Sequence, residues 1–260
     1  MERFYLFIGF FIGFLVAGVS FTFIRTRKNL GKTNSGGAEA DEFLEPLIRA
    51  ENVLGKTTED SSNAIIMISK AYFLSISEFH AGNLRQLDEL ESEIEEFNQR
   101  ARRLKANTYR IIQQLQHDSI ETGHYYVQIV DYLREMAHSI KYVVRPLRQH
   151  LIDKYRPFAE DQNSELTEFS NQVTDFLNFA LHIIKESRFE QIDELILKRK
   201  DILEQMGEHE KKQIRRIKKK ETTSRNSILY FGLMFETKHL LLQSVNLLKA
   251  TRDFVSFTKS

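Results

Sequence analysis

The stretch GHYYVQIVDYLREMAHSIKYVVRP, residues 123–146, decides the fold class of this chain. Here and in the residue just beyond it, apolar side chains recur at intervals of three and four, the spacing of a helix with one core-facing stripe. They are Ile129, Leu133, Met136, Ala137, Ile140, Val143, Val144 and Leu147. A polar band follows the opposite face: His124, Gln128, Asp131, Glu135, His138 and Tyr142. A helix face that is only solvated more often carries Lys, Arg and Glu, so this band indicates chemistry or a partner.

Composition narrows the class of protein. The chain has 260 residues, of which 42% are hydrophobic and 28% charged, enough apolar residues for a sizeable core. Because 37 basic residues oppose 36 acidic ones, no overall field attracts nucleic acid. The absence of cysteine excludes a disulfide framework and a thiolate metal site. With 3 prolines, 11 glycines and no strand-like alternation, the expected class is all-α.

The first 28 residues have the character of a transmembrane anchor. Residues 4–24 form a run of 21 residues without a charge, which as a helix spans the roughly 30 Å hydrocarbon layer of a bilayer. A signal peptide would carry its charge before the apolar run, whereas here Arg25, Arg27, Lys28 and Lys32 follow it. By the positive-inside rule, we expect a single-pass protein of the inner (cytoplasmic) membrane with its helical domain in the cytoplasm. Residues 29–59 are expected to hold a flexible linker and a short helix that Pro46 interrupts.

The rest of the chain divides into two similar halves, residues 60–156 and 157–260. Each half has an apolar helix, a charged helix and a second apolar helix. Asp60, Ser61 and Ser62 are expected to cap the first helix, and Gly82-Asn83 to end it. The expected helices cover residues 60–80, 84–117, 123–146, 166–187, 188–221 and 226–257.

Matching residues support this repeat. The segment Gln86–Leu90 reads QLDEL, and Gln191–Leu195 reads QIDEL. Each last helix contains a Glu-x-x-His pair, Glu135 with His138 and Glu236 with His239. A basic cluster precedes each last helix: Arg100, Arg102, Arg103 and Lys105, then Lys211, Lys212, Arg215, Arg216, Lys218, Lys219 and Lys220. Two bundles of three helices are the simplest account.

Residues 120–132 (IETGHYYVQIVDY) and 236–249 (ETKHLLLQSVNLLK) resemble the PhoU-like cytoplasmic domain at the C-terminus of bacterial PiT-family inorganic phosphate transporters. The resemblance implies a pair of three-helix bundles and a role in phosphate transport or its regulation. One candidate spanning segment is too few for a permease. The expectation is therefore a membrane-tethered regulatory domain, or the C-terminal part of a transporter, with a phosphate transporter or phosphate-signalling membrane protein as partner.

The same resemblance implies a metal site, because PhoU proteins bind metal through Glu/Asp-x-x-x-Asp motifs. Asp131 and Glu135 match that spacing, whereas Gly232 stands where the second half needs its first carboxylate. Glu-x-x-His pairs also occur in di-iron bundles, with further carboxylates from other helices, here Glu89 and Glu194. The candidate ligands of a divalent or iron cation are Asp131, Glu135, His138, Glu236 and His239. The alternative is that these residues are surface polar groups.

The basic clusters are candidate sites for an anion, a lipid headgroup or an acidic partner, with a solvated helix face as the alternative. The residues are Arg100, Arg102, Arg103, Lys105, Arg215, Arg216, Lys218, Lys219 and Lys220. No nucleic-acid-binding signature accompanies them. The chain also lacks a nucleophile elbow, a P-loop and a dinucleotide fingerprint, so an enzyme is not expected.

Three functions follow from the sequence. The leading one is a non-catalytic, PhoU-like regulator of phosphate uptake. The alternatives are a structural helical scaffold that senses no ligand, and a di-metal carboxylate protein. The sequence leaves open whether the chain forms a homo-oligomer.

Overall fold

The structure is a computed structural model that describes residues 49–115 and 120–259. These residues form seven α-helices and one short 3-10 helix. In chain order they are α2 (Ala50–His80), α3 (Leu84–Ala106), α4 (Thr108–Gln114), α5 (Ile120–Ile152), α6 (Glu160–Lys185), η1 (Phe189–Gln191), α7 (Ile192–Lys219) and α8 (Ser224–Lys259). The all-α prediction is confirmed for this part of the chain.

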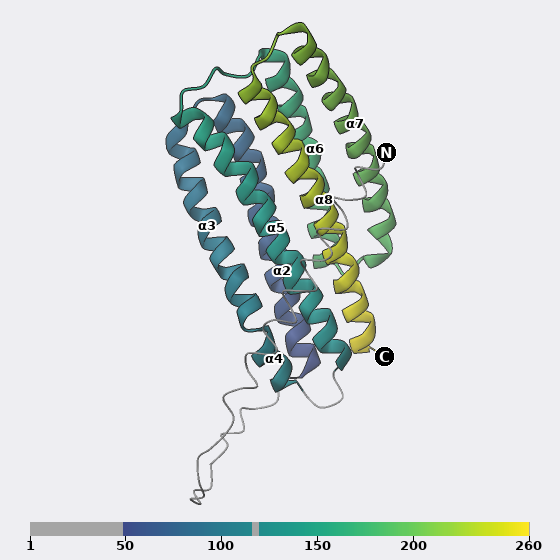
Figure 1. The fold of residues 1–260 in the computed structure, drawn as a ribbon. Coiled ribbons are helices and arrows are strands. Elements are labelled where there is room, and N and C mark those ends of the chain that lie inside the picture. Colours follow the sequence, from purple (N-terminus) through teal and green to yellow (C-terminus); the bar gives the residue numbers. More distant parts are fainter. Residues whose placement is uncertain (1–48, 116–119, 260) are drawn as a thin grey trace, which may run out of the picture. The chain divides into compact units, whose positions relative to one another are not determined.

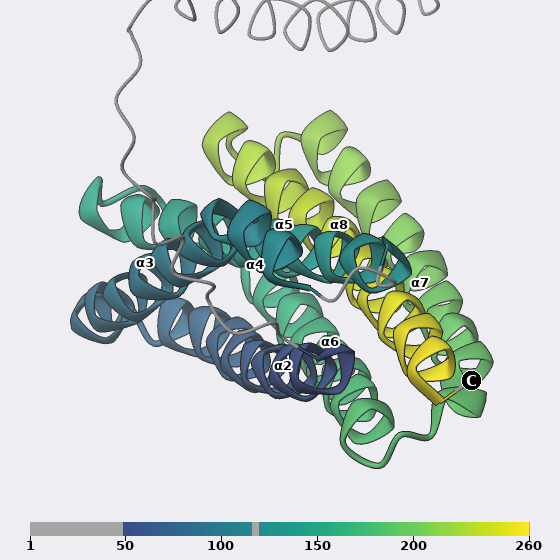
Figure 2. The same cartoon turned by 90° about the horizontal axis from the view of Figure 1, so that it is seen from below.

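The long helices pack as two groups of three (Figure 1). Helices α2, α3 and α5 contact one another, as do α6, α7 and α8. Contacts of α5 with α8 and of α2 with α6 join the groups, and residues 45–260 form one compact unit. Figure 2 shows α3 and α7 on opposite sides of the four joining helices. The short α4 lies against α3 and α5 at the lower end in Figure 1.

Helix α5 is central to the core, as its apolar stripe predicts. All eight stripe residues are buried, and Leu133, the most exposed of them, has 3% of its surface accessible. Burial of this stripe against α2, α3 and α8 removes apolar surface from water at roughly 25 cal/mol per Å². The stripe therefore supplies much of the energy that holds the two groups together.

The expected start of α2 at Asp60 was wrong. The helix begins at Ala50, and Thr57 and Ser61 lie buried inside it. The Thr57 hydroxyl donates to the carbonyl of Val53 at 2.8 Å, and the Ser61 hydroxyl donates to the carbonyl of Thr57 at 2.6 Å. The hydroxyl groups of these small residues therefore donate hydrogen bonds to carbonyls four residues earlier in the helix, although the same residue types favour helix caps. The expected short helix before residue 55 merges with α2 from Ala50 onward, and its earlier part lies outside the described residues.

Two other expected boundaries also changed. The charged segment 84–117 divides at Asn107 into α3 and α4. Pro146 does not end α5, which continues to Ile152. Leu147 and His150 are buried beyond the proline, so packing maintains the helix across the hydrogen bond that proline cannot donate.

The predicted anchor, residues 4–24, lies outside the described residues. Among the helices of residues 49–115 and 120–259, none combines the length and apolar character needed to cross a bilayer.

Candidate functional site

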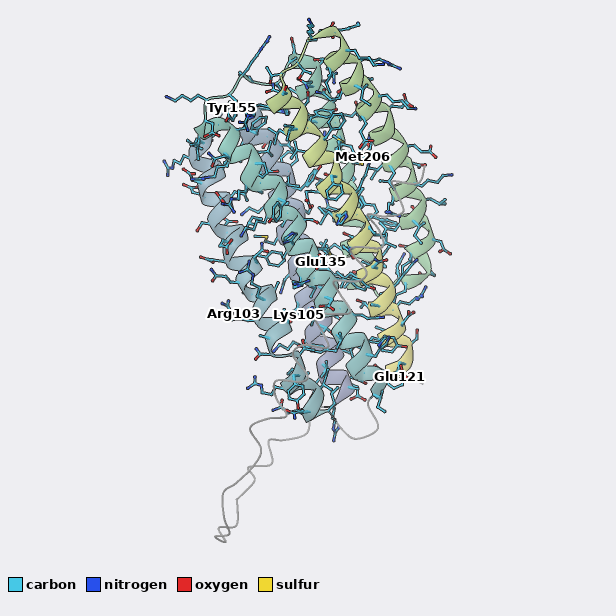
Figure 3. All side chains as sticks on the ribbon, viewed as in Figure 1. Arg103, Lys105, Glu121, Glu135, Tyr155 and Met206 are labelled. Atoms are coloured by element: carbon cyan, nitrogen blue, oxygen red, sulfur yellow. The ribbon has the colours of Figure 1, made fainter. Side chains whose placement is uncertain are left out.

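An open groove of about 670 Å³ lies between the C-terminal half of α5 and the N-terminal half of α8. We call it the α5/α8 groove. Tyr155, which lines one end, lies at the end of the bundle away from α4 (Figure 3). The main lining side chains from the two helices and from the turn after α5 are Tyr142, Pro146, Gln149, Asp153, Arg225, Ile228, Phe231, Phe235 and Glu236.

Large apolar side chains line this groove and remain open to solvent. Ile228 is 69% exposed, Phe235 is 57% exposed and Tyr142 is 45% exposed. Ile228, Phe235 and Leu242 recur at seven-residue intervals, so they share one outward face of α8 while Leu229, Leu233 and Leu240 are buried. A contiguous apolar surface of this kind marks an interaction site.

Gly232 deepens the middle of the groove. A Cβ built at this position would meet no atom within 4 Å, so the missing side chain leaves open space. The reasoning from sequence recognised Gly232 only as a missing carboxylate and did not find the groove. A signal was present, because α8 carries apolar residues on every side, and such a helix is either buried or covered by a partner.

One of the five candidate metal ligands, Glu236, lines the groove, and His138 and His239 lie near it. Glu236 of α8 accepts a hydrogen bond from Ser139 of α5 and lies within electrostatic reach of His239 and His138. Burial raises the pKa of Glu236 above its ordinary value, against the opposing effect of Ser139 and the two histidines. The His138 ring is 4.4 Å from that of Tyr142, centroid to centroid.

The other two candidate ligands have basic partners. Asp131 forms an ion pair with Lys105 of α3, and Glu135 forms one with Arg134 beside it. Glu89 and Glu194 are exposed and pair with basic residues of their own helices, Arg85 and Lys198. Within residues 49–115 and 120–259, no group of three or more His, Asp or Glu side chains converges closely enough to hold a metal. Binding of a cation by the five candidates stays a prediction.

The two basic clusters differ in position and in exposure. Arg100, Arg102, Arg103 and Lys105 lie exposed near the lower end of α3, whereas the cluster of α7 lies at the opposite end of the bundle (Figures 1 and 3). In the α7 cluster, Arg215, Lys218, Lys219 and Lys220 are exposed.

Arg216 does not share that exposed surface. It follows Ile202, Met206, His209 and Gln213 on the buried face of α7, at spacings of three and four that the sequence already contains. Its guanidinium lies 2.6 Å from Asp161 and 2.8 Å from Glu165 of α6, measured from Nη2 to the nearest carboxylate oxygen. The earlier grouping of Arg216 with an anion-binding surface is therefore corrected: its charge is used inside the protein.

Comparison with known proteins bears on the fold. No protein-family model and no curated protein matches the sequence. Among solved structures, the phosphate transport system regulatory protein PhoU from Streptococcus pneumoniae superposes with a TM-score of 0.65. The alignment covers 80% of this chain and 97% of that one, with 10% sequence identity. The fold is PhoU-like.

This finding confirms the predicted PhoU-like architecture, and at such low identity it shows the fold alone. The placement at the C-terminus of a PiT-family transporter stays a prediction. The α5/α8 groove is the best candidate functional site on this PhoU-like bundle, because it joins exposed apolar side chains to a half-buried carboxylate.

Proposed function

We propose that this PhoU-like domain is a non-catalytic regulator of inorganic phosphate transport, tethered to the inner membrane by residues 4–24. It acts by docking onto the cytoplasmic part of a phosphate transporter or a phosphate-signalling membrane protein. The observation that supports this most is the alignment over 97% of a phosphate transport regulatory protein. The same proposal holds if the chain is the C-terminal part of a transporter, since the docking partner is then its own membrane domain.

The α5/α8 groove is the proposed docking surface. Its exposed Ile228 and Phe235 and its half-buried Phe231 fit the mode in which an amphipathic helix places apolar residues into a groove at spacings of three, four and seven. Charged groups of both signs also line the groove: Arg225 and Asp153, and Lys238 of α8 paired with Glu210 of α7. The occupant we propose is therefore a cytoplasmic amphipathic helix of the partner, with an apolar face and flanking charges of both signs.

The experiment fills the groove without disturbing the core. Gly232→Leu places a side chain in the open space of the groove, and Gly55→Leu places the same side chain on an exposed part of α2 with no neighbour within 4 Å. Each variant is returned to cells from which the gene has been removed, and phosphate uptake and the phosphate-starvation response are measured. We expect Gly232→Leu to behave like the deletion and Gly55→Leu like the wild type.

Two results would count against the proposal in different ways. Unchanged uptake and an unchanged starvation response in the deletion strain would remove the regulatory function. A clear deletion phenotype that Gly232→Leu fully restores would keep the function and remove the α5/α8 groove as its docking surface.

A further inference from the structure

The end of the bundle that carries α4 exposes apolar side chains that the proposed function does not use. Ile120 is 83% exposed and Tyr109 is 72% exposed, the highest values for large hydrophobic residues in the described part of the chain. Ile112, one turn after Tyr109 on α4, is 38% exposed. We call this surface, with the basic residues that surround it, the α4 end.

Packing of α4 on α5 places these side chains at the surface. A Cβ built on Gly123 would lie 3.6 Å from Cγ1 of Ile112 and 3.7 Å from Cδ1 of Leu115, so α4 contacts α5 where α5 has no side chain. Ile120 is three residues before Gly123 and therefore on the same face of α5. The contact brings Ile112 and Ile120 to one side of the bundle end, while Tyr109 stays exposed one turn earlier.

Unpaired positive charge surrounds this apolar surface. Lys105 is neutralised by Asp131, but four exposed arginines of α3 and α4 form no ion pair with any described residue. In Figure 3, Arg103 lies at the lower end of α3 on one side of the bundle end, and the exposed acid Glu121 lies on the other side, at the start of α5. A second exposed acid, Glu51, stands in the first turn of α2. The four arginines are Arg100, Arg102, Arg103 and Arg110.

The N-terminal segment joins the bundle at this same end. Helix α2 begins at Ala50, and its Asp60 lines a small cavity with Arg100 and Leu104 near the end of α3. Only residues 25–49 separate this point from the uncharged run 4–24 along the chain. An inserted run 4–24 would therefore hold the α4 end near the bilayer at a high effective concentration.

We propose that the α4 end lies on an anionic lipid surface. The arginines bind headgroup phosphates, for which the planar guanidinium is suited, and Tyr109, Ile112 and Ile120 enter the interfacial layer. Neither group is sufficient alone: the apolar surface is small, and a basic surface without apolar contacts is easily displaced by salt. Together they are the combination by which helices bind the face of an anionic membrane.

This orientation constrains which part of the partner can reach the α5/α8 groove. That consequence rests on the proposed function, whereas the lipid contact itself does not depend on it. Tyr142 at the α5/α8 groove is 22 residues beyond Ile120 on α5, which corresponds to about 33 Å at 1.5 Å per residue. With the α4 end on the bilayer and α5 upright, the groove stands well above the lipid. The helix that fills it must then come from a cytoplasmic part of the partner.

The chain contains no tryptophan, so the proposal can be tested in the full-length protein with a single introduced fluorophore. Tyr109→Trp places it in the α4 end, and Leu197→Trp places a matched control on α7, where Leu197 is 61% exposed. Both proteins are reconstituted with vesicles of phosphatidylcholine alone or with about 30% phosphatidylglycerol. We expect a blue shift and quenching by brominated lipid only for Tyr109→Trp, and only with phosphatidylglycerol.

Removing charge tests the arginines separately. Adding Arg102→Gln, Arg103→Gln and Arg110→Gln to Tyr109→Trp should lower the equilibrium constant of the lipid contact about 100-fold, at roughly fivefold per arginine. Circular dichroism of each variant confirms that the helices are retained. Added inorganic phosphate at constant ionic strength should leave the blue shift unchanged.

Four outcomes would overturn the proposal. They are no blue shift with phosphatidylglycerol, an equal shift on phosphatidylcholine, an equal shift for Leu197→Trp, and loss of the shift on adding inorganic phosphate, which would assign the arginines to free phosphate. The phosphate-uptake phenotype enters none of them, so failure here leaves the proposed function standing.

Discussion

Arg215 and Arg216 are neighbours on α7, yet their surroundings are opposite. Arg215 is exposed, whereas Arg216 is buried and binds Asp161 and Glu165 of α6. Burial disfavours the charged guanidinium and lowers the pKa of Arg216, but the hydrogen bonds that Arg216 donates to Asp161 and Glu165 outweigh burial and keep the pKa above its ordinary value. Tyr230 of α8 donates to Glu165 at 2.9 Å, so one buried cluster links α6, α7 and α8.

Removing Arg216 leaves the largely buried Glu165 without its guanidinium partner. We expect Arg216→Ala to lower the free energy of unfolding by about 3–5 kcal/mol, and Arg215→Ala to change it by less than about 0.5 kcal/mol. Urea unfolding of the two variants and the wild type gives both values. Equal effects of the two substitutions would show that the cluster is not important for stability.

The same cluster predicts how stability depends on acid. Burial raises the pKa of Glu165, but hydrogen bonds from Arg216 and Tyr230 outweigh burial and hold it below the ordinary value. A carboxylate whose pKa is lower in the folded state stabilises the fold above its unfolded pKa, and this contribution is lost as pH falls through the folded pKa. We therefore expect the stability difference between wild type and Glu165→Gln to shrink below about pH 4.3, the unfolded pKa of a glutamate. Thermal midpoints between pH 7 and pH 3 measure it, and parallel curves for the two proteins would exclude this role.

At the scale of single helices, the ends of α2, α5, α6 and α7 share one geometry. A residue in the left-handed region follows each helix: Gly82 (φ 66°), Lys154 (φ 51°), Ser187 (φ 53°) and Lys220 (φ 61°). The next N–H then bonds to the carbonyl five residues back, as from Asn83 to Glu78 at 2.9 Å and from Glu221 to Arg216 at 2.9 Å. This is the Schellman arrangement, and only Gly82 marks it in the sequence.

Two glycines, one inside α2 and one just after it, give a matched test of this account. Gly82 is left-handed, so Gly82→Ala should destabilise the protein by about 1 kcal/mol. Gly55 lies inside α2 with no neighbour within 4 Å, so Gly55→Ala should stabilise it by about 0.4–1 kcal/mol. Denaturant unfolding of both variants checks the opposite signs. A stabilising Gly82→Ala would contradict the role of the left-handed turn.

At the scale of the whole molecule, one core crosses the boundary between the two groups of helices. The Tyr72 and Thr237 hydroxyls of α2 and α8 share a buried hydrogen bond of 2.8 Å. Tyr125 of α5 stacks on Phe254 of α8 with ring centroids 5.9 Å apart. Residues 45–260 therefore form one compact unit and should unfold as one.

Removal of residues 1–44 tests two expectations together: that the bundle unfolds as one unit, and that residues 4–24 anchor the chain to the membrane. We expect the truncated chain to unfold in a single transition at the wild-type midpoint, because the deleted residues lie outside the compact unit. Membrane association that remains should be weakened by salt, since it then depends on the α4 end, whose arginines attract anionic lipid electrostatically. Differential scanning calorimetry and membrane flotation with and without about 0.5 M salt give the two readouts. Salt-resistant retention of the truncated chain would show that residues 4–24 are not its anchor.

The sequence by itself determined the helical class, the buried stripe of α5 and the turn at Gly82. Each of these depends on residues within a few positions of one another: a period of 3.6 defines a face, and glycine admits a left-handed backbone without strain. The same spacing of three and four residues also predicts that Arg216 lies on the buried face of α7. The basic residues beside it in the sequence hide that pattern.

Only the tertiary structure decided which faces acquire a neighbour. Thr57 and Ser61 are interior because α2 extends back to Ala50, and α5 passes Pro146 because Leu147 and His150 are packed beyond it. The gathering of His138, Glu236 and His239, and the exposure of Ile228 and Phe235, depend on how α8 lies against α5, about 100 residues away in the chain. A local pattern specifies that a face is apolar or charged, but the partner that covers it comes from a distant segment, and packing alone selects that partner.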